Sequence, residues 1–249
     1  MKGWHKESYR HYLASKGIKT AKYKVPPAWK NVKYPKDKLY AVSGVDDKGR
    51  TQYIYPQKFS DKTSSEKFKR IKRFGTEAPA IMNEVKKDID KENNTEAEVI
   101  YTIYKTGFRP GSDKDTLADK KVYGASNLLK KQVKVSGDKV NFKFTGKKGV
   151  EVDKTVKDAR LAKIIKRRKV SERLFDTSET QVREYFEDKT KGKYHVKDIR
   201  TLKAAQVAKA TKGTKKEVAI KVSEELGNTP AIALSSYIPP ETLTGRKDK

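Results

Sequence analysis

Cysteine is absent from this chain of 249 residues, and histidine occurs only three times, at His5, His11 and His195. Without cysteine there can be no disulfides, no thiolate metal ligands and no cysteine nucleophile. Three histidines scattered along the sequence argue against a zinc cluster, which needs several ligands close together. Any chemistry that this chain performs must therefore use other side chains.

Long apolar runs are also missing. No window approaches the roughly 18 apolar residues that a membrane-spanning helix needs. The first residues, MKGWHK, lack the apolar core of a secretory signal. We therefore expect an intracellular protein that has no membrane partner.

Acidic residues are scarce relative to basic ones. Lys and Arg together number 59 against 32 Asp and Glu, which gives a net charge of +27. Such a charge attracts polyanions, so nucleic acid is the predicted partner. The alternative is a solvated basic surface, as in a protein that binds anionic membranes or in a ribosomal protein. Charge alone says nothing about catalysis.

The beginning of the chain has the patterns of a basic arm and a small sheet. Residues 1–25 are rich in lysine and end at two prolines, which disfavour helix in the residue that precedes them. Residues 39–42 and 52–55 are β-favouring runs on either side of DDKGR at residues 46–50. This arrangement predicts a β-hairpin.

A helix and then an interruption are expected next. Apolar residues spaced among lysines predict an amphipathic helix over residues 61–74. GTEAP at residues 75–79 contains glycine and proline, which predicts the end of that helix and a hinge. We therefore expect two domains, residues 1–76 and residues 77–249.

The second domain begins with helical patterns and continues with strands. Apolar residues four apart over residues 81–89 form a helical stripe, and Thr95 followed by Glu98 matches a capping box. Alternating apolar residues over 133–144, around a Ser-Gly-Asp turn, predict a hairpin with one buried face. A third strand is expected at residues 150–152.

Helical spacing resumes after Leu161. Val218, Val222 and Leu226 form a stripe that stops at Gly227, a favoured residue for ending a helix. The predicted fold class is α+β. A small β-rich N-terminal domain is followed by a mainly helical domain that contains an inserted small antiparallel sheet.

Three short segments of the second domain contain basic residues of interest. GFRPGS at residues 107–112 is followed by VYGA at residues 122–125. FTGKK at residues 144–148 lies where the predicted sheet turns, and KDIRT spans residues 197–201. The planar guanidinium of an arginine in such a segment can bind two phosphate oxygens at once.

The end of the chain contains a candidate nucleophile. GNTPAIALSSYIP occupies residues 227–239. With the three basic segments before it, in this order, it resembles the nucleophile segment of type IB DNA topoisomerases, and the resemblance covers roughly residues 20–240. It implies that Tyr237 attacks a phosphodiester of double-stranded DNA.

The resemblance also implies roles for the other motif residues. Arg109 and Arg200 would contact the scissile phosphate, with Lys197 as a supporting contact. Lys147 would deliver a proton to the departing 5′ oxygen, a step worth roughly 10²–10⁴-fold in rate. Asn228 would donate a hydrogen bond to a nonbridging oxygen without titrating near neutral pH.

Three features bear on this assignment. Lys105, like Arg109, precedes a glycine by two residues and is the rival first cation, although the spacing to VYGA favours Arg109. Lys148 stands where many relatives carry an acidic residue. Tyrosine recombinases, which share this catalytic domain, usually carry histidine where Lys197 stands, so we do not expect His195 to be catalytic.

The N-terminal domain carries a second part of the resemblance. PPAW at residues 26–29 and GRTQYIY at residues 49–55 resemble the small β-rich domain that poxvirus and bacterial enzymes place across the major groove. Gln52, Tyr53 and Tyr55 match positions that contact DNA there, and such side chains suit base edges and phosphates. Alternate tyrosines on a strand also pack cores, so this interpretation has a structural alternative.

The implied activity is relaxation of supercoiled duplex DNA. One strand would be cleaved through a 3′-phosphotyrosyl intermediate, rotate and be resealed, without ATP or a metal cofactor. A monomer would clamp the duplex in a C shape. Two alternatives stay open, namely a tyrosine recombinase or integrase and an inactive basic DNA-binding relative.

Overall fold

The computed structural model describes residues 23–35, 39–112, 121–168 and 172–248. The basic arm expected over residues 1–25 therefore lies almost entirely outside the described residues. The chain divides into two compact units, and the boundary lies between Lys67 and Phe68. The assignment of residues 1–76 to a DNA clamp and of residues 77–249 to catalysis stays a prediction.

The first unit contains a three-stranded antiparallel sheet in the order β1 (Lys30–Lys33), β2 (Val42–Val45) and β3 (Thr51–Ile54). The β2–β3 hairpin confirms the predicted hairpin, although its first strand begins at Val42 and not at Leu39, and β1 was not expected. Trp29 packs on β2 at Gly44, where an added Cβ atom would come within 2.6 Å of the indole ring. A glycine is therefore needed there for the tryptophan to cover the strand.

The break expected at GTEAP was wrong, because one helix, α2, runs without interruption over Gln57–Glu92. Proline in a helix removes one hydrogen bond and crowds the carbonyl four residues earlier. Here that carbonyl belongs to Gly75, and Pro79 itself is exposed. The buried stripe of α2 continues through the proline, with Phe74, Ala78, Met82, Val85 and Ile89 all in the core. Burial on both sides of Pro79 outweighs the cost of the proline.

Six further helices are described in the second unit: α3 (Thr95–Thr106), α5 (Ala159–Arg167), α6 (Glu179–Lys189), α7 (Val196–Ala210), α8 (Lys215–Leu226) and α9 (Pro230–Ser236). The capping box expected at Thr95 was wrong. Asn94 caps α3 by accepting a hydrogen bond from the Ala97 backbone N–H at 2.7 Å. The buried Glu98 carboxylate instead binds Arg167 and Arg168, because burial demands charged partners for it.

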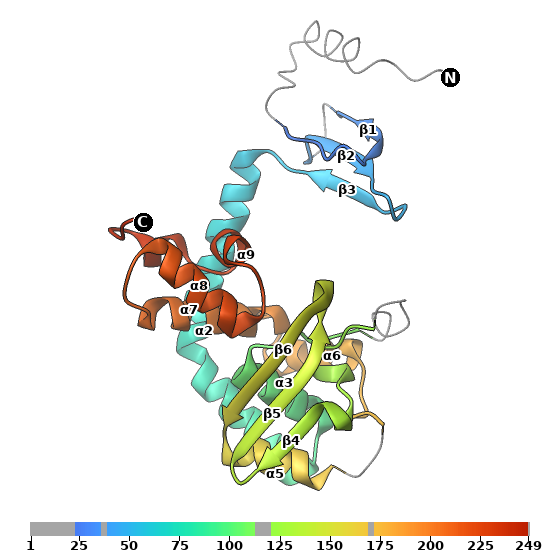
Figure 1. Ribbon diagram of the computed structural model, residues 1–249, viewed down its shortest axis with the longest axis vertical. Helices are drawn as coiled ribbons and strands as arrows, with labels where there is room; N and C mark the ends of the chain where they lie inside the picture. The colour runs from blue at the N-terminus through green and yellow to red at the C-terminus, as the bar shows by residue number, and fades with distance from the viewer. Residues whose placement is uncertain (1–22, 36–38, 113–120, 169–171, 249) are drawn as a thin grey trace, which may run out of the picture. The chain divides into compact units, whose positions relative to one another are not determined.

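The second sheet is formed by β4 (Val133–Ser136), β5 (Lys139–Gly146) and β6 (Val150–Lys157), all antiparallel, which confirms the predicted hairpin and third strand. Helix α5 packs against β4 and β5, and α3 packs against β6 (Figure 1). Phe108 contacts Phe142 and Phe144 of β5 edge-on, with ring centroids 5.1 and 5.0 Å apart. These contacts anchor the start of the loop that follows α3.

Helices α7, α8 and α9 enclose a smaller apolar cluster at the end of the chain. Ala204, Val222 and Ala233 are fully buried in it, and Tyr237 packs against its edge. The stripe predicted on α8 is confirmed, with Gly227 in the left-handed conformation at φ 60°. The α+β fold class is confirmed. Within the described ranges, no helix has both the length and the apolar character that a membrane span requires.

Candidate active site

Arg109 lies on the loop that follows α3, and backbone hydrogen bonds hold this loop against residues 123–127. The Ala125 N–H donates to the Arg109 carbonyl at 2.8 Å, and the Ser126 N–H donates to the Pro110 carbonyl at 2.6 Å. Gly124 permits the close approach, since a Cβ atom there would lie 2.5 Å from the Gly111 nitrogen. The VYGA segment therefore supports the backbone that presents Arg109.

Arg200 comes from α7 and is almost fully buried, with 4% of its surface exposed. Its guanidinium donates to the carbonyls of Gly107 and Leu226, the latter at 2.5 Å. One arginine thus joins the C-terminal ends of α3 and α8. The start of α7 is held by Arg70 of α2, which forms a two-pronged ion pair with Asp198 at 2.9 and 3.0 Å.

Tyr237 follows α9 and is half-buried, with its ring centroid 5.3 Å from the Arg200 guanidinium carbon. Burial alone would raise the pKa of the phenol. The positive charges of Arg200 and Arg109, and hydrogen bonding to them, outweigh burial and lower the Tyr237 pKa below its ordinary 10.0. For Arg200, burial lowers the pKa, and the interaction with the charge of Tyr237 opposes that change. The three side chains therefore form one electrostatic cluster.

Asn228 follows the glycine that ends α8. Its backbone N–H donates to the Ser223 carbonyl at 3.1 Å. Both polar atoms of its side-chain amide are buried and have no hydrogen-bond partner among the described residues. Buried amides are rarely left unpaired, so this amide lacks a partner that such a group normally has.

Two predicted residues are placed at the surface without contacts to this cluster. Lys147 is exposed in the turn between β5 and β6. Lys197 is exposed on the first turn of α7. In the part of the chain that the structure describes, neither ammonium group makes an ion pair or a hydrogen bond. Both are free to meet a phosphate.

Lys105, the rival of Arg109, is engaged elsewhere. Its ammonium lies 2.7 Å from Asp158 and 5.4 Å from the centre of the Tyr101 ring. His195 precedes α7 and lies at the surface, 3.5 Å from the Glu187 carboxylate. Neither residue contributes to the cluster around Tyr237.

The predicted DNA-contacting residues lie on and after β3 of the first unit. Tyr53 and Tyr55 are 46% and 41% exposed. The Gln52 amide donates to Asp46 at 3.0 Å, and Arg50 binds the same carboxylate at 2.9 and 2.7 Å. Arg50, which shares this carboxylate with Gln52, was not among the predicted DNA-contacting residues, although its place in the DDKGR turn was a signal. The Arg50 side chain, together with the backbone N–H groups of Arg50 and Lys48, lowers the pKa of Asp46 to about 2.

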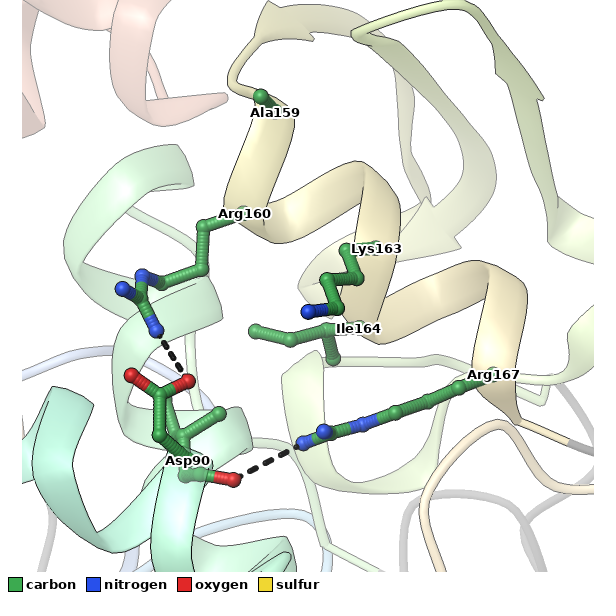
Figure 2. Close-up of a pocket in the computed structure, with 7 residues that line it drawn as sticks. Asp90, Ala159, Arg160, Lys163, Ile164 and Arg167 are labelled. Atoms are coloured by element: carbon green, nitrogen blue, oxygen red, sulfur yellow. Dashed lines mark hydrogen bonds and ion pairs between the residues drawn. The ribbon is translucent and has the colours of Figure 1, made fainter.

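Two cavities elsewhere in the second unit have volumes of about 490 and 520 Å³ and flank α5. Their lining is basic, with Lys163 and Arg167 shared between them. In the first of these, shown in Figure 2, Arg160 binds Asp90 at 2.6 Å and Arg167 reaches the Ile89 carbonyl. None of the predicted site residues lines either cavity, so these hollows are separate from the Tyr237 cluster.

One more cation, largely buried, has no signal in the sequence. Lys154 of β6 donates to the carbonyls of Thr106 and Glu225 and pairs with the Glu225 carboxylate at 2.8 Å. Alternation along a strand predicts which residues face inward, but it does not predict what a buried lysine meets there.

Comparison with known proteins identifies the family. The catalytic core of eukaryotic DNA topoisomerase I, taken as a family model, matches residues 56–228. The chain belongs to the type IB DNA topoisomerase family. This chain is 24% identical to the DNA topoisomerase 1B of Acanthamoeba polyphaga mimivirus over an alignment of 261 residues. The alignment covers 89% of this chain and 77% of that protein.

Membership makes the chain a DNA topoisomerase, an isomerase that acts on DNA. The region that matches the topoisomerase core contains Arg109, Lys147 and Arg200, and it ends at Asn228. Tyr237 lies beyond that region. Its candidacy therefore depends on the motif around it and on the two arginines that lie beside it.

Proposed function

We propose that this topoisomerase relaxes supercoiled duplex DNA by cleaving one strand through a 3′-phosphotyrosyl intermediate, allowing rotation and resealing the strand. The observation that carries this proposal is the meeting of Arg109, Arg200 and Tyr237. Two cations beside one phenol favour its phenolate form and leave positive charge where a phosphate would lie.

The reaction exchanges one phosphate ester for another. The Tyr237 oxygen, after losing its proton to water, forms a bond to phosphorus while the bond to the 5′ oxygen breaks. The 5′ oxygen takes a proton from the Lys147 ammonium and leaves as a hydroxyl. Reversal of the same steps reseals the strand. Bond energy is retained in the phosphotyrosine, so the cycle uses neither ATP nor a metal cofactor.

Fixed donors stabilise the transition state. Arg109 and Arg200 neutralise charge that accumulates on the phosphate oxygens, and the unpaired Asn228 amide donates to one of them. Such preorganised donors typically contribute 10²–10³-fold each in rate. The engagement of Lys105 by Asp158 supports Arg109 as the first phosphate-binding cation.

The first unit is the proposed DNA clamp. Tyr53 and Tyr55 offer exposed edges, and Asp46 orients the side chains of Arg50 and Gln52. The net charge of +27 attracts the duplex phosphates. We propose that the chain acts as a monomer on DNA inside the cell.

Relaxation of negatively supercoiled plasmid in EDTA without ATP tests this function. Reactions stopped with detergent should contain relaxed DNA and a covalent protein adduct on a 3′ end. Tyr237→Phe should remove the adduct and leave duplex affinity within about twofold. An adduct that persists in this variant would show that another residue is the nucleophile. Tight binding without relaxation or adduct would favour a recombinase or an inactive relative.

The role of Lys147 has its own test. Lys147→Ala should slow cleavage by roughly 10²–10⁴-fold, because the 5′ oxygen leaves poorly without a proton. A substrate with sulfur at the 5′-bridging position leaves without protonation and should recover most of that rate. Failure of this rescue would remove Lys147 from the role of acid.

A further inference from the structure

Lys154 is a largely buried cation of β6, with 17% of its side chain exposed, and it lies outside the proposed catalytic set. Its ammonium donates to the Thr106 carbonyl at 2.7 Å and to the Glu225 carbonyl at 2.9 Å. The Glu225 carboxylate, 2.8 Å away, supplies the opposite charge and also lies 3.5 Å from Lys203. Burial lowers the pKa of Lys154 in spite of that carboxylate. A lysine in such a place needs every one of these partners.

The partners of Lys154 are adjacent in sequence to those of Arg200. Lys154 binds the carbonyls of Thr106 and Glu225, and Arg200 binds those of Gly107 and Leu226. The ends of α3 and α8 are thus held together by two cations, one from a strand and one from a helix. Cations are favoured at helix C-termini, where carbonyls lack partners. Among the described residues, Lys154 is the one whose ion pair connects these helix ends to the β-sheet.

The β5–β6 hairpin is fixed along the Arg109 loop at two levels. Lys154 binds the end of α3 at Thr106, just before that loop begins, and near the turn the Tyr123 N–H donates to the Thr145 carbonyl at 2.8 Å. Lys147 lies just beyond Thr145, in the turn itself. The hairpin therefore carries Lys147 at its tip and is attached at Lys154 to the helix ends that precede Arg109 and Asn228.

We propose that Lys154 is a positioning residue that holds the β5–β6 hairpin, and with it Lys147, in register with the side chains that bind the phosphate. This inference rests on the proposed function. Lys154 is four residues along β6 from Val150, roughly 13 Å at about 3.3 Å per residue. A rotation of about 5° at this anchor moves the turn by roughly 1 Å, and a shift of about 1 Å can cost on the order of 10² in rate.

Single-turnover cleavage of duplex DNA by the full chain, at saturating protein, tests the proposal with paired oxygen and 5′-bridging sulfur substrates. Lys154→Met should reduce the rate on the oxygen substrate by on the order of 10²-fold. On the sulfur substrate it should cleave within a few-fold of the unmodified protein, because no acid is needed there. Lys154→Arg, which can still donate to both carbonyls, should keep most of the rate.

Lys157→Met is the matched control, since it removes an exposed cation of the same strand that lies 3.6 Å from Asp138. It should cleave both substrates at the unmodified rate. If Lys154→Met proves unfolded by its thermal transition, Lys154→Gln, which can still donate to one carbonyl, replaces it in the same assay.

Two results would overturn the inference. One is an unchanged rate for Lys154→Met on the oxygen substrate. The other is an equal loss on both substrates, which would mean that Lys154 supports the phosphate site or general stability rather than the acid. If the unmodified protein forms no adduct, the proposed function is wrong, and the inference about Lys154 is wrong as well. If adducts form and sulfur rescues Lys147→Ala but not Lys154→Met, only the role of Lys154 fails.

Discussion

Arg200→Met separates two effects that one side chain exerts. In the structure Arg200 joins the carbonyls of Gly107 and Leu226 and lies beside the phenol of Tyr237. Hydrogen bonds to a charged group contribute about 1.5–3 kcal/mol each. Allowing for water reaching the freed carbonyls, we expect the free energy of unfolding to fall by about 3 kcal/mol. For a unit of this size, Tm should fall by roughly 6–12 °C.

The chemical effect appears in the pH profile. In the unmodified protein the charges of Arg200 and Arg109 lower the Tyr237 pKa, so cleavage should rise with pH below the ordinary range of a tyrosine. Without Arg200, the charge of Arg109 alone opposes the effect of burial on the Tyr237 pKa. The rising limb of the cleavage rate against pH should therefore move to higher pH. The maximal rate should also fall by on the order of 10²–10³-fold, because one transition-state donor is lost.

Single-turnover cleavage measured from pH 6 to 10, together with thermal unfolding, reports both effects. Arg109→Met is the matched control. In the described part of the chain the Arg109 guanidinium holds no backbone carbonyl, so this variant should lose rate without a comparable loss of Tm. An Arg200→Met protein with unchanged Tm and an unmoved rising limb would refute the reasoning.

Three further predictions follow from the contacts of single residues. Asn228→Ala should slow cleavage by roughly 10–100-fold without lowering Tm, since the amide has no partner to lose; a clear drop in Tm would show that the amide is structural. Lys105→Met should lower Tm slightly through loss of the Asp158 pair but leave cleavage within a few-fold, and a loss of 10²-fold would return Lys105 to the phosphate site. Because the Asp46 pKa is depressed from 3.8 to about 2, the stability that its carboxylate adds is complete above about pH 4 and lost as pH falls towards 2. Asp46→Asn should therefore reduce the dependence of the first unit's stability on pH over that interval. An acid unfolding transition that is the same in the variant would contradict the assignment.

Local patterns predicted the elements whose signals lie within a short window. The hairpin around the DDKGR turn, the β4–β6 sheet and the stripe of α8 all follow from spacing and turn residues over a few positions. The same reasoning failed at Pro79, where packing on both sides keeps α2 continuous. It also failed at Thr95, because burial of Glu98 between two arginines outweighs its use in a capping box.

The sequence by itself determined the chemical inventory of the protein. It excluded thiol chemistry, set a charge suited to DNA and placed the basic motifs and Tyr237 in the order of the type IB topoisomerases. Only the tertiary structure decided that Arg109, and not Lys105, lies beside Tyr237. It also decided that Lys154 and Arg200 join the same two helix ends. These facts depend on side chains that meet from segments far apart in the chain. Spacing along a sequence reports the face of one helix or strand, but not what that face will touch.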